Sequence, residues 1–268
     1  MATEFISILA IPRTGTNYLC GLLGRFSEID SLYEIYHNQA VYLGNQQLAQ
    51  KIIEHVNRKY QLKIKNHKDL RFINFVNHNP QEIIKIIRLY STSKYISFKI
   101  FPNHLSKQDL SNVIIQNKQI KKIVIQRNLL DVYFSLNFAK MTASWSDQDT
   151  SNLRLDFNPD HFLSWYTCHQ KYYQFIEEES KNHHCKISIL KYETIHRCQT
   201  NRDKFIFMFD FLRSIGLQIA ESNLSTAQQK LSNLRVKQDK RLNIIDKVNN
   251  PDLLTTTLQN NKLEFLLT

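Results

Sequence analysis

Residues 12–17 combine the side chains and the backbone freedom needed to hold an anion. The surrounding stretch, residues 6–23, is an apolar strand that runs through this short turn into a helix with apolar periodicity. A helix N-terminus leaves several backbone N–H groups unpaired, and the helix dipole adds partial positive charge there. The turn supplies one conformationally free residue, three side-chain donors and one forked cation, namely Gly15, Thr14, Thr16, Asn17 and Arg13.

The same turn lacks the parts of a Walker A loop. That loop requires the pattern G-x-x-x-x-G-K-[ST], in which Lys contacts the phosphates and Ser or Thr binds magnesium. Neither the first Gly nor the Lys is present. The turn therefore predicts a phosphate or sulfate cradle outside the metal-dependent nucleoside triphosphatases.

A second segment has the arrangement of a phosphate site. Residues 121–126 (KKIVIQ) form a buried-strand pattern, and Arg127 follows at its carboxyl end. Ser135 lies two turns into the helix behind it. Both side chains can therefore reach one phosphate beside the edge of the sheet.

Together these two segments resemble the cytosolic-type sulfotransferases that use 3′-phosphoadenosine 5′-phosphosulfate (PAPS). PRTGTNYL is similar to their 5′-phosphosulfate loop, and RNLLDVYFS is similar to their 3′-phosphate motif, an Arg followed eight positions later by a Ser. The Arg in the loop, the RNLLD run and residues 95–105 are closest to the bacterial branch that sulfates saccharides and small natural products. The resemblance implies that Arg127 and Ser135 bind the 3′-phosphate. It implies that the 5′-phosphosulfate is held by Arg13, Thr14, Gly15, Thr16 and Asn17.

Further matches follow in the family's order, so the resemblance covers most of the chain. Tyr18 matches the aromatic position that stacks on adenine, and Tyr192 matches the Tyr of a Tyr-Glu pair near the same base. Core packing is the alternative role for both tyrosines. Residues 211–217 (FLRSIGL) are similar to the family's F-L-G-L helix end.

Residues 235–241 (RVKQDKR) stand where the family carries a basic loop over the 3′-phosphate. The resemblance implies roles there for Lys237 and Gln238, although the Gly that many members have in an Arg-Lys-Gly run is missing. A solvated charge run is the alternative. Asp131, inside the second motif, is better explained as a carboxylate near a helix start than as a ligand.

Sulfuryl transfer requires a base for the acceptor proton and positive charge on the sulfuryl oxygens and the leaving phosphate. A sulfuryl group bears less charge than a phosphoryl group, so side-chain cations such as Arg13 can suffice without a metal. Two residues compete as the base. Glu34, after the first helix, resembles the catalytic carboxylate of the bacterial trehalose sulfotransferase. His104, just past a strand end, resembles the catalytic His of the animal enzymes' K-T-H segment, although its interval from the Lys is longer.

Each candidate base has its own requirement. The carboxylate needs a pKa raised by burial among Tyr33, Ile35 and Tyr36, whereas a His has a suitable pKa without help. Substrate positioning is the alternative role for either residue. Lys99 either assists transition-state charge or is a surface Lys at a strand end, and His37 is expected to be exposed.

Alternating apolar strands and helices predict an α/β fold with a central parallel β-sheet flanked by helices on both faces. The resemblance implies a P-loop-NTPase-like sulfotransferase fold. A single domain is expected over 1–268, with 216–268 as a polar cofactor-covering segment that ends in a short helix at 252–259. The expected strands are 5–11, 95–101, 121–126 and 185–192, and the expected helices are 16–26, 45–59, 80–91, 129–142, 160–181 and 203–215.

Composition sets bounds on location and partners. The 268 residues, 42% of them hydrophobic, are enough for one sizeable core. No stretch approaches the ~18 apolar residues of a membrane span, and no signal peptide is visible. The four cysteines lack metal-type spacing. We therefore expect a reducing cytoplasm, free thiols and no metal.

The net charge of +11 would suit a nucleic acid partner. However, the Lys and Arg residues are scattered along the chain, and a polyanionic nucleotide donor explains the sign equally well. No nucleic acid partner is expected, and the oligomeric state is left open. The expected partner is a small hydroxylated acceptor molecule.

The leading hypothesis is a PAPS-dependent sulfotransferase that acts on a hydroxyl, or secondarily an amine, of a saccharide or small natural product of secondary metabolism. The alternatives are a P-loop-type nucleotide or nucleoside kinase and a non-catalytic nucleotide- or nucleic-acid-binding module. The acceptor pocket is expected near residues 34–42, 72–78 and 141–149, with Trp145 as a candidate for ring stacking. Trp165 lies in a helix pattern that indicates core.

Overall fold

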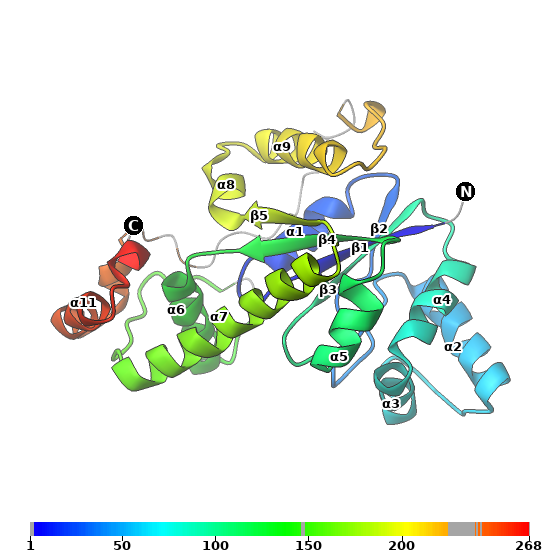
Figure 1. Ribbon diagram of the computed structural model, residues 1–268, viewed down its shortest axis with the longest axis horizontal. Coiled ribbons are helices and arrows are strands. Elements are labelled where there is room, and N and C mark those ends of the chain that lie inside the picture. The colour runs from blue at the N-terminus through cyan, green and yellow to red at the C-terminus, as the bar shows by residue number, and fades with distance from the viewer. Residues whose placement is uncertain (1–2, 146–147, 225–238, 240, 242, 268) are drawn as a thin grey trace.

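The computed structural model describes residues 3–145, 148–224, 239, 241 and 243–267, which form alternating strands and helices (Figure 1). The strands are β1 (Glu4–Leu9), β2 (Ile29–Ser31), β3 (Tyr95–Ile100), β4 (Ile120–Gln126) and β5 (Ile187–Lys191). The α-helices are α1 (Thr16–Leu23), α2 (Gln46–Tyr60), α3 (Leu70–His78), α4 (Pro80–Tyr90), α5 (Lys107–Asp109), α6 (Leu129–Thr142), α7 (Pro159–Asn182), α8 (Tyr192–Arg197), α9 (Asn201–Ser214) and α11 (Pro251–Asn260). The shorter helical turns are η1 (Leu110–Ile115), η2 (Ile244–Lys247) and η3 (Glu264–Leu267).

The five strands form one sheet in the order β2-β3-β1-β4-β5, and every neighbouring pair is parallel. The expected α/β fold with a central parallel sheet is therefore confirmed. From β1 the chain passes beyond β3 to form β2, and after β3 it crosses to the other side of β1. The strand order thus reverses beside β1, and ligands of open α/β sheets bind outside the strand ends at such a point.

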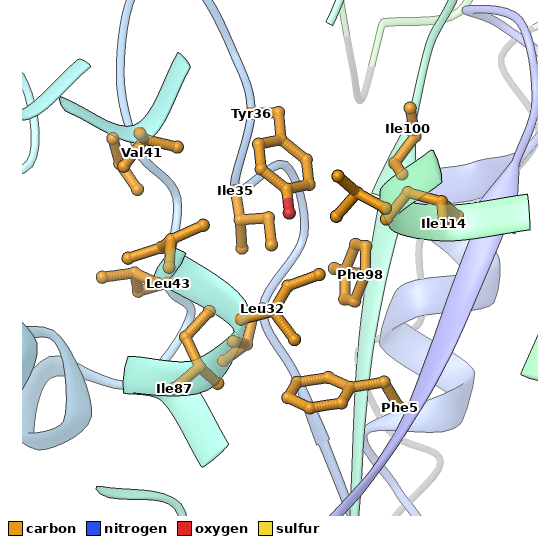
Figure 2. Close-up of a cluster of buried hydrophobic side chains, with 14 of the residues drawn as sticks. Phe5, Leu32, Ile35, Tyr36, Val41, Leu43, Ile87, Phe98, Ile100 and Ile114 are labelled. Atoms are coloured by element: carbon orange, nitrogen blue, oxygen red, sulfur yellow. The ribbon is translucent and has the colours of Figure 1, made fainter. Parts of the chain in front are cut away.

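Helices cover both faces of the sheet because successive strand side chains point to opposite faces. On one face Ile6 and Ile8 of β1 pack against α1 and α9. On the other face Phe5 and Leu9 pack against α2, α3, α4, η1 and α7. Figure 1 shows α9 on one side of the sheet and α4 and α7 on the other, and Figure 2 shows Phe5 and Phe98 in the larger cluster.

Short polar side chains cap the N-termini of several helices in this glycine-poor chain. Asn128, for example, accepts hydrogen bonds from the N–H groups of Leu130 and Asp131 at the start of α6. Thr200 and Asp203 form a reciprocal capping box at the start of α9. The other described α-helices with such a cap are α2, α3, α5 and α7, which begin after Asn45, Asp69, Ser106 and Asn158.

All the expected strands and helices are present, with their ends shifted by up to a few residues, but some elements were missed. The strand β2 has three residues and no apolar run, so it gave no periodic pattern. The expected acceptor loop at 72–78 is wrong, because these residues belong to α3 and bury Phe72, Phe75 and Val76 in the core.

The C-terminal segment carries more apolar packing than its expected polar character suggested. Leu254 and Leu258 of α11, the expected terminal helix, are fully buried. They pack with Phe134 and Phe138 of α6 in a third cluster. The side-chain amide of Asn128 also donates to the carbonyl of Leu266 at 2.8 Å. The end of the chain is therefore docked on the helix that follows β4. None of the described helices is long and apolar enough to cross a membrane.

Candidate active site

A cavity of about 910 Å³ lies at the carboxyl ends of the strands. Each of the five strands is followed within a few residues by a side chain that lines it. These residues are Arg13 after β1, Glu34 after β2, His104 after β3, Arg127 after β4 and Tyr192 after β5. The structure therefore brings both sequence motifs and both candidate bases into one wall.

The backbone of the turn between β1 and α1 has a conformation that lets a ligand approach closely. Gly15 caps α1 with φ 85°, a left-handed conformation in which a side chain is strained. A Cβ atom at this position would overlap the ring of Tyr192. Thr16 and Asn17 form the first turn of α1 and line the cavity. The N-terminus of α1 thus faces the cavity with the polarity that suits an anion.

Thr14 does not serve as the side-chain donor that was expected. Its side chain is fully buried, and its hydroxyl donates to the carbonyl of Ile11 at 2.8 Å. The hydroxyl closes the turn, because a buried hydroxyl needs an internal partner. Thr14 is not among the residues that line the cavity. Asn17 does line the cavity, with its amide oxygen accepting a hydrogen bond from Lys99.

Arg13 joins the two phosphate motifs. Its Nε donates to Ser135 Oγ at 3.1 Å across 122 residues of sequence, and its Nη1 donates to the carbonyl of Trp145 at 2.5 Å. Burial and the nearby charge of Arg127 lower the pKa of Arg13 to about 10. The guanidinium is therefore a fixed cation beside a second one, an arrangement that an anion between them would stabilise.

Arg127 is held on three sides. Its Nη1 donates to the carbonyl of Arg13 at 2.7 Å, and its Nε donates to Asp131 Oδ2 at 3.0 Å. The ring of Tyr192 lies 4.4 Å from its central carbon. Asp131 opposes the effect of burial and raises the pKa of Arg127. Asp131 thus orients the guanidinium from the first turn of α6, in keeping with its expected role as a helix carboxylate.

Glu34 and Lys99 form an ion pair in the cavity wall. Glu34 Oε1 lies 2.8 Å from Lys99 Nζ, and the side chain of Lys99 is only 2% exposed. This burial rules out the alternative that Lys99 is a surface residue at a strand end. The same ammonium group reaches Asn17 in the first turn of α1. Lys99 therefore connects the candidate base to the anion-binding turn.

His104 faces the other oxygen of the same carboxylate. Its Nε2 lies 3.5 Å from Glu34 Oε2, and its Nδ1 accepts a hydrogen bond from the N–H of Phe101 at 3.3 Å. A neutral imidazole that accepts at Nδ1 carries its proton on Nε2. Burial, followed by the charges of His37 and Lys99, lowers the pKa of His104 to about 3. This geometry makes His104 a donor toward Glu34 near neutral pH.

The surroundings of Glu34 differ from the apolar pocket that was expected. Ile35 and Tyr36 point into the hydrophobic core (Figure 2), where the Tyr36 hydroxyl donates to the carbonyl of Pro80 at 2.8 Å. Tyr33 has φ 62°, and this left-handed turn sends consecutive side chains to different sides. The cavity side of the segment consequently presents charged and imidazole groups to Glu34.

His37 is a site residue whose position the sequence did not reveal. Its Nδ1 accepts from the N–H of Gln39 at 3.1 Å, and its Nε2 lies 3.8 Å from Glu34 Oε2. Its spacing of three residues from Glu34 was the available signal. Its side chain is 24% exposed and faces Glu34, so simple surface exposure does not describe it. The nearby wall is polar, with Gln39, Tyr42, Asn103 and Trp145 from the expected segments 34–42 and 141–149 and from the β3 loop.

Two tyrosines line the opposite end of the cavity. Tyr18 is half-buried, and its hydroxyl has no hydrogen-bond partner among the described residues. Burial raises the pKa of Tyr18 to about 12 and also raises that of Tyr192. Beside them lie His196 and Lys204, which no sequence motif predicted, although His196 follows Tyr192 by one helical turn. Lys204 Nζ lies 5.8 Å from the centre of the Tyr18 ring.

The structure does not describe two of the expected donor-site residues, and it places the second tryptophan in the core. Lys237 and Gln238, expected over the 3′-phosphate, lie outside the described residues. Trp165 packs against the core clusters, as its helix pattern indicated. Within the described part of the chain, no group of three or more His, Cys, Asp or Glu side chains is placed to hold a metal ion.

No family model matches the chain, and no curated protein matches it. Solved structures of similar shape include a mouse sulfotransferase complexed with PAP, at 16% identity and a TM-score of 0.45, covering 98% of this chain and 82% of that one. A sulfotransferase from Mycobacterium tuberculosis has 10% identity and a TM-score of 0.47, covering 97% and 77%. One from Alicyclobacillus acidocaldarius has 11% identity and a TM-score of 0.44, covering 100% and 96%. Because these identities and scores are low, we base the function on the cavity's own residues.

Proposed function

We propose that this chain is a PAPS-dependent sulfotransferase that transfers a sulfuryl group to a hydroxyl, or secondarily an amine, of a small molecule. The observation that carries the proposal is the contact between the two phosphate motifs, in which Arg13 Nε donates to Ser135 Oγ at 3.1 Å. Two phosphate-type motifs that meet in one cavity suit a nucleotide with phosphates at both ends of its ribose. A kinase of the P-loop type would not need the second motif, formed by Arg127 and Ser135.

The wall fits such a nucleotide. The left-handed Gly15, whose missing side chain leaves room for the Tyr192 ring, lets the backbone approach a phosphosulfate. Arg127 uses three of its five N–H groups on Asp131 and Arg13, and the others remain for the 3′-phosphate beside Ser135. The rings of Tyr18 and Tyr192, with a tyrosine hydroxyl that lacks a partner among the described residues, suit an adenine base.

In the proposed mechanism Glu34 accepts the proton of the acceptor hydroxyl. Bound PAPS supplies the activated sulfuryl group. Lys99 holds Glu34 Oε1 and reaches the anion-binding turn, so it would supply positive charge to the transferred group. His104 donates from Nε2 toward Glu34 Oε2 and orients the carboxylate. Arg13 stabilises the charge of the leaving phosphate.

The acceptor would be a saccharide or small natural product. Its end of the cavity offers hydrogen-bonding groups and rings, which suit a modest hydroxylated molecule. A single domain over 1–268, with 216–268 covering the donor through Lys237 and Gln238, and a cytoplasmic location complete the proposal. The groups that would meet the acceptor are His37, Gln39, Tyr42, Asn103 and Trp145.

Thermal-shift measurements test the donor. We expect a larger stabilisation by adenosine 3′,5′-bisphosphate than by AMP or by ATP with magnesium. With ligand at ~100 times its dissociation constant, binding to the native state adds ~2.7 kcal/mol of stability. A larger shift with ATP and magnesium would instead support a kinase. Binding to polynucleotide without a response to the bisphosphate would support a non-catalytic module.

A further inference from the structure

The wall of the proposed donor cavity contains carboxylates where a polyanionic ligand would be repelled. Asp131 and Asp239 both line the cavity, at the end formed by Arg127. A like charge near a phosphate disfavours binding strongly when both are shielded from water. Some cation must therefore offset these two carboxylates if a 3′-phosphate is to bind beside them.

Lys247 forms ion pairs with both carboxylates. Its Nζ forms an ion pair with Asp131 Oδ1 and a second with Asp239 Oδ2 at 3.2 Å. Its side chain is 3% exposed and is not part of the cavity wall, so it contacts the two carboxylates from behind. It belongs to η2, 116 residues away from Asp131 in sequence.

Both carboxylates are held in the charged form. Burial would raise the pKa of Asp131, but the charges of Arg127 and Lys247 outweigh it and lower that pKa. The pKa of Asp239 is likewise lowered against burial, by the hydrogen bond from Arg241 and the charge of Lys247. Their negative charge must consequently be balanced by cations rather than removed by protonation.

Lys247 also decides how firmly Asp131 holds Arg127. Asp131 binds Arg127 through Oδ2 and Lys247 through Oδ1, so its charge is shared between two cations. Asp239 is similarly shared between Lys247 and Arg241, whose Nη1 donates to the carbonyl of Leu153 at 2.6 Å. Three cations and two carboxylates leave one positive charge in excess, and this excess disappears without Lys247.

We propose that Lys247 is a positioning residue for 3′-phosphate recognition, which it supports from behind the wall by balancing Asp131 and Asp239. The inference rests on the proposed function. It gives Lys247, which follows the expected basic loop at 235–241, a role at the donor site alongside Asp239 of that loop. Loss of Lys247 should selectively weaken the binding of ligands that carry a 3′-phosphate. The carboxylates that it neutralises line the end of the cavity formed by Arg127.

Calorimetric titration of the full chain with adenosine 3′,5′-bisphosphate and with AMP tests this selectivity. Lys247→Met should weaken bisphosphate binding by about 10- to 100-fold, because one unit of positive charge is lost close to the bound phosphate in a partly shielded site. AMP binding should change by no more than about 2-fold. Lys181→Met is the matched control, because it removes the same charge from an exposed pair with Glu177. The control should bind both ligands like the wild type.

A charge-restoring variant separates electrostatics from damage to the fold. Adding Asp239→Asn to Lys247→Met removes one carboxylate with the cation, so bisphosphate binding should recover to within about 3-fold of the wild type. Asp239→Asn alone leaves Lys247 in place and should tighten bisphosphate binding without changing AMP binding. This single variant keeps the test decisive if Lys247→Met does not fold.

The outcomes distinguish the inference from the function on which it rests. Equal losses for AMP and the bisphosphate in Lys247→Met, or no recovery in the double variant, would overturn the role of Lys247 and leave the donor assignment standing. Weaker bisphosphate binding by Asp239→Asn would overturn it as well. A wild-type chain that binds neither ligand would overturn both.

Discussion

At the scale of single residues, Glu34 and His104 are no longer equivalent candidates for the base. Glu34 has one oxygen on Lys99 at 2.8 Å and the other facing His104 at 3.5 Å. His104 already accepts a hydrogen bond at Nδ1 from the backbone N–H of Phe101. A residue that donates toward the carboxylate orients it and does not replace it as the proton acceptor.

Replacement of each residue tests these roles. Glu34→Gln keeps the shape and removes the proton acceptor, so sulfuryl transfer should fall by about 10²–10⁴-fold while bisphosphate binding stays near normal. His104→Asn keeps a donor near Glu34 and should cost less. Steady-state rates and calorimetry on both variants measure this. A nearly normal rate in Glu34→Gln together with an inactive His104→Asn would reverse the assignment.

At the scale of elements, the turn between β1 and α1 is built around one glycine. Gly15 has φ 85°, and its α-carbon faces the Tyr192 ring at the start of α8. The turn, the carboxyl end of β5 and the helix that follows it are therefore packed against one another. A side chain here would disturb two elements at once.

Gly15→Ala should lower the free energy of unfolding by about 1–3 kcal/mol, because it adds left-handed strain and displaces the Tyr192 ring. It should also weaken bisphosphate binding. Urea unfolding and calorimetry provide the measurements. Gly24→Ala is the control, since Gly24 has φ −67° and an added Cβ would lie 3.5 Å from its nearest neighbour. Similar small effects in both variants would contradict this view of the turn.

At the scale of the whole molecule, the cavity wall places charged and titratable groups inside the fold, and stability should therefore depend on pH. His104 has a pKa lowered from 6.5 to about 3 by burial and by the charges of His37 and Lys99. The unfolded chain consequently binds a proton at this residue between those values, and the folded chain does not. Stability from this group is present above the unfolded pKa and is lost as the pH falls.

From about pH 7.5 to about pH 5, this residue should cost the wild type roughly 2 kcal/mol of unfolding free energy. Urea unfolding at both pH values measures the loss. His104→Asn has no group to protonate there, so its loss should be smaller by that amount. An equal loss in both proteins would mean that His104 titrates normally in the fold.

The sequence alone determined the parallel α/β arrangement and the positions of its two phosphate-type motifs. Short, β-branched apolar runs such as residues 121–126 favour buried strands of a covered sheet, and a turn such as residues 12–17 has its chemistry in adjacent residues. Local patterns of this kind are visible because they depend on neighbours in the chain. They predicted the main strands and helices and placed Arg13 and Arg127 correctly at strand ends.

Only the tertiary structure decided how the site's side chains are used. Thr14 was expected to donate to a ligand, but packing turns its hydroxyl inward. Lys247 meets Asp131 across 116 residues, a pairing that no local pattern encodes. The roles of Glu34 and His104 likewise depend on which atoms each one faces, and those atoms come from different strands. Burial and charge pairing are set by residues distant in sequence, so they appear only when the chain is folded.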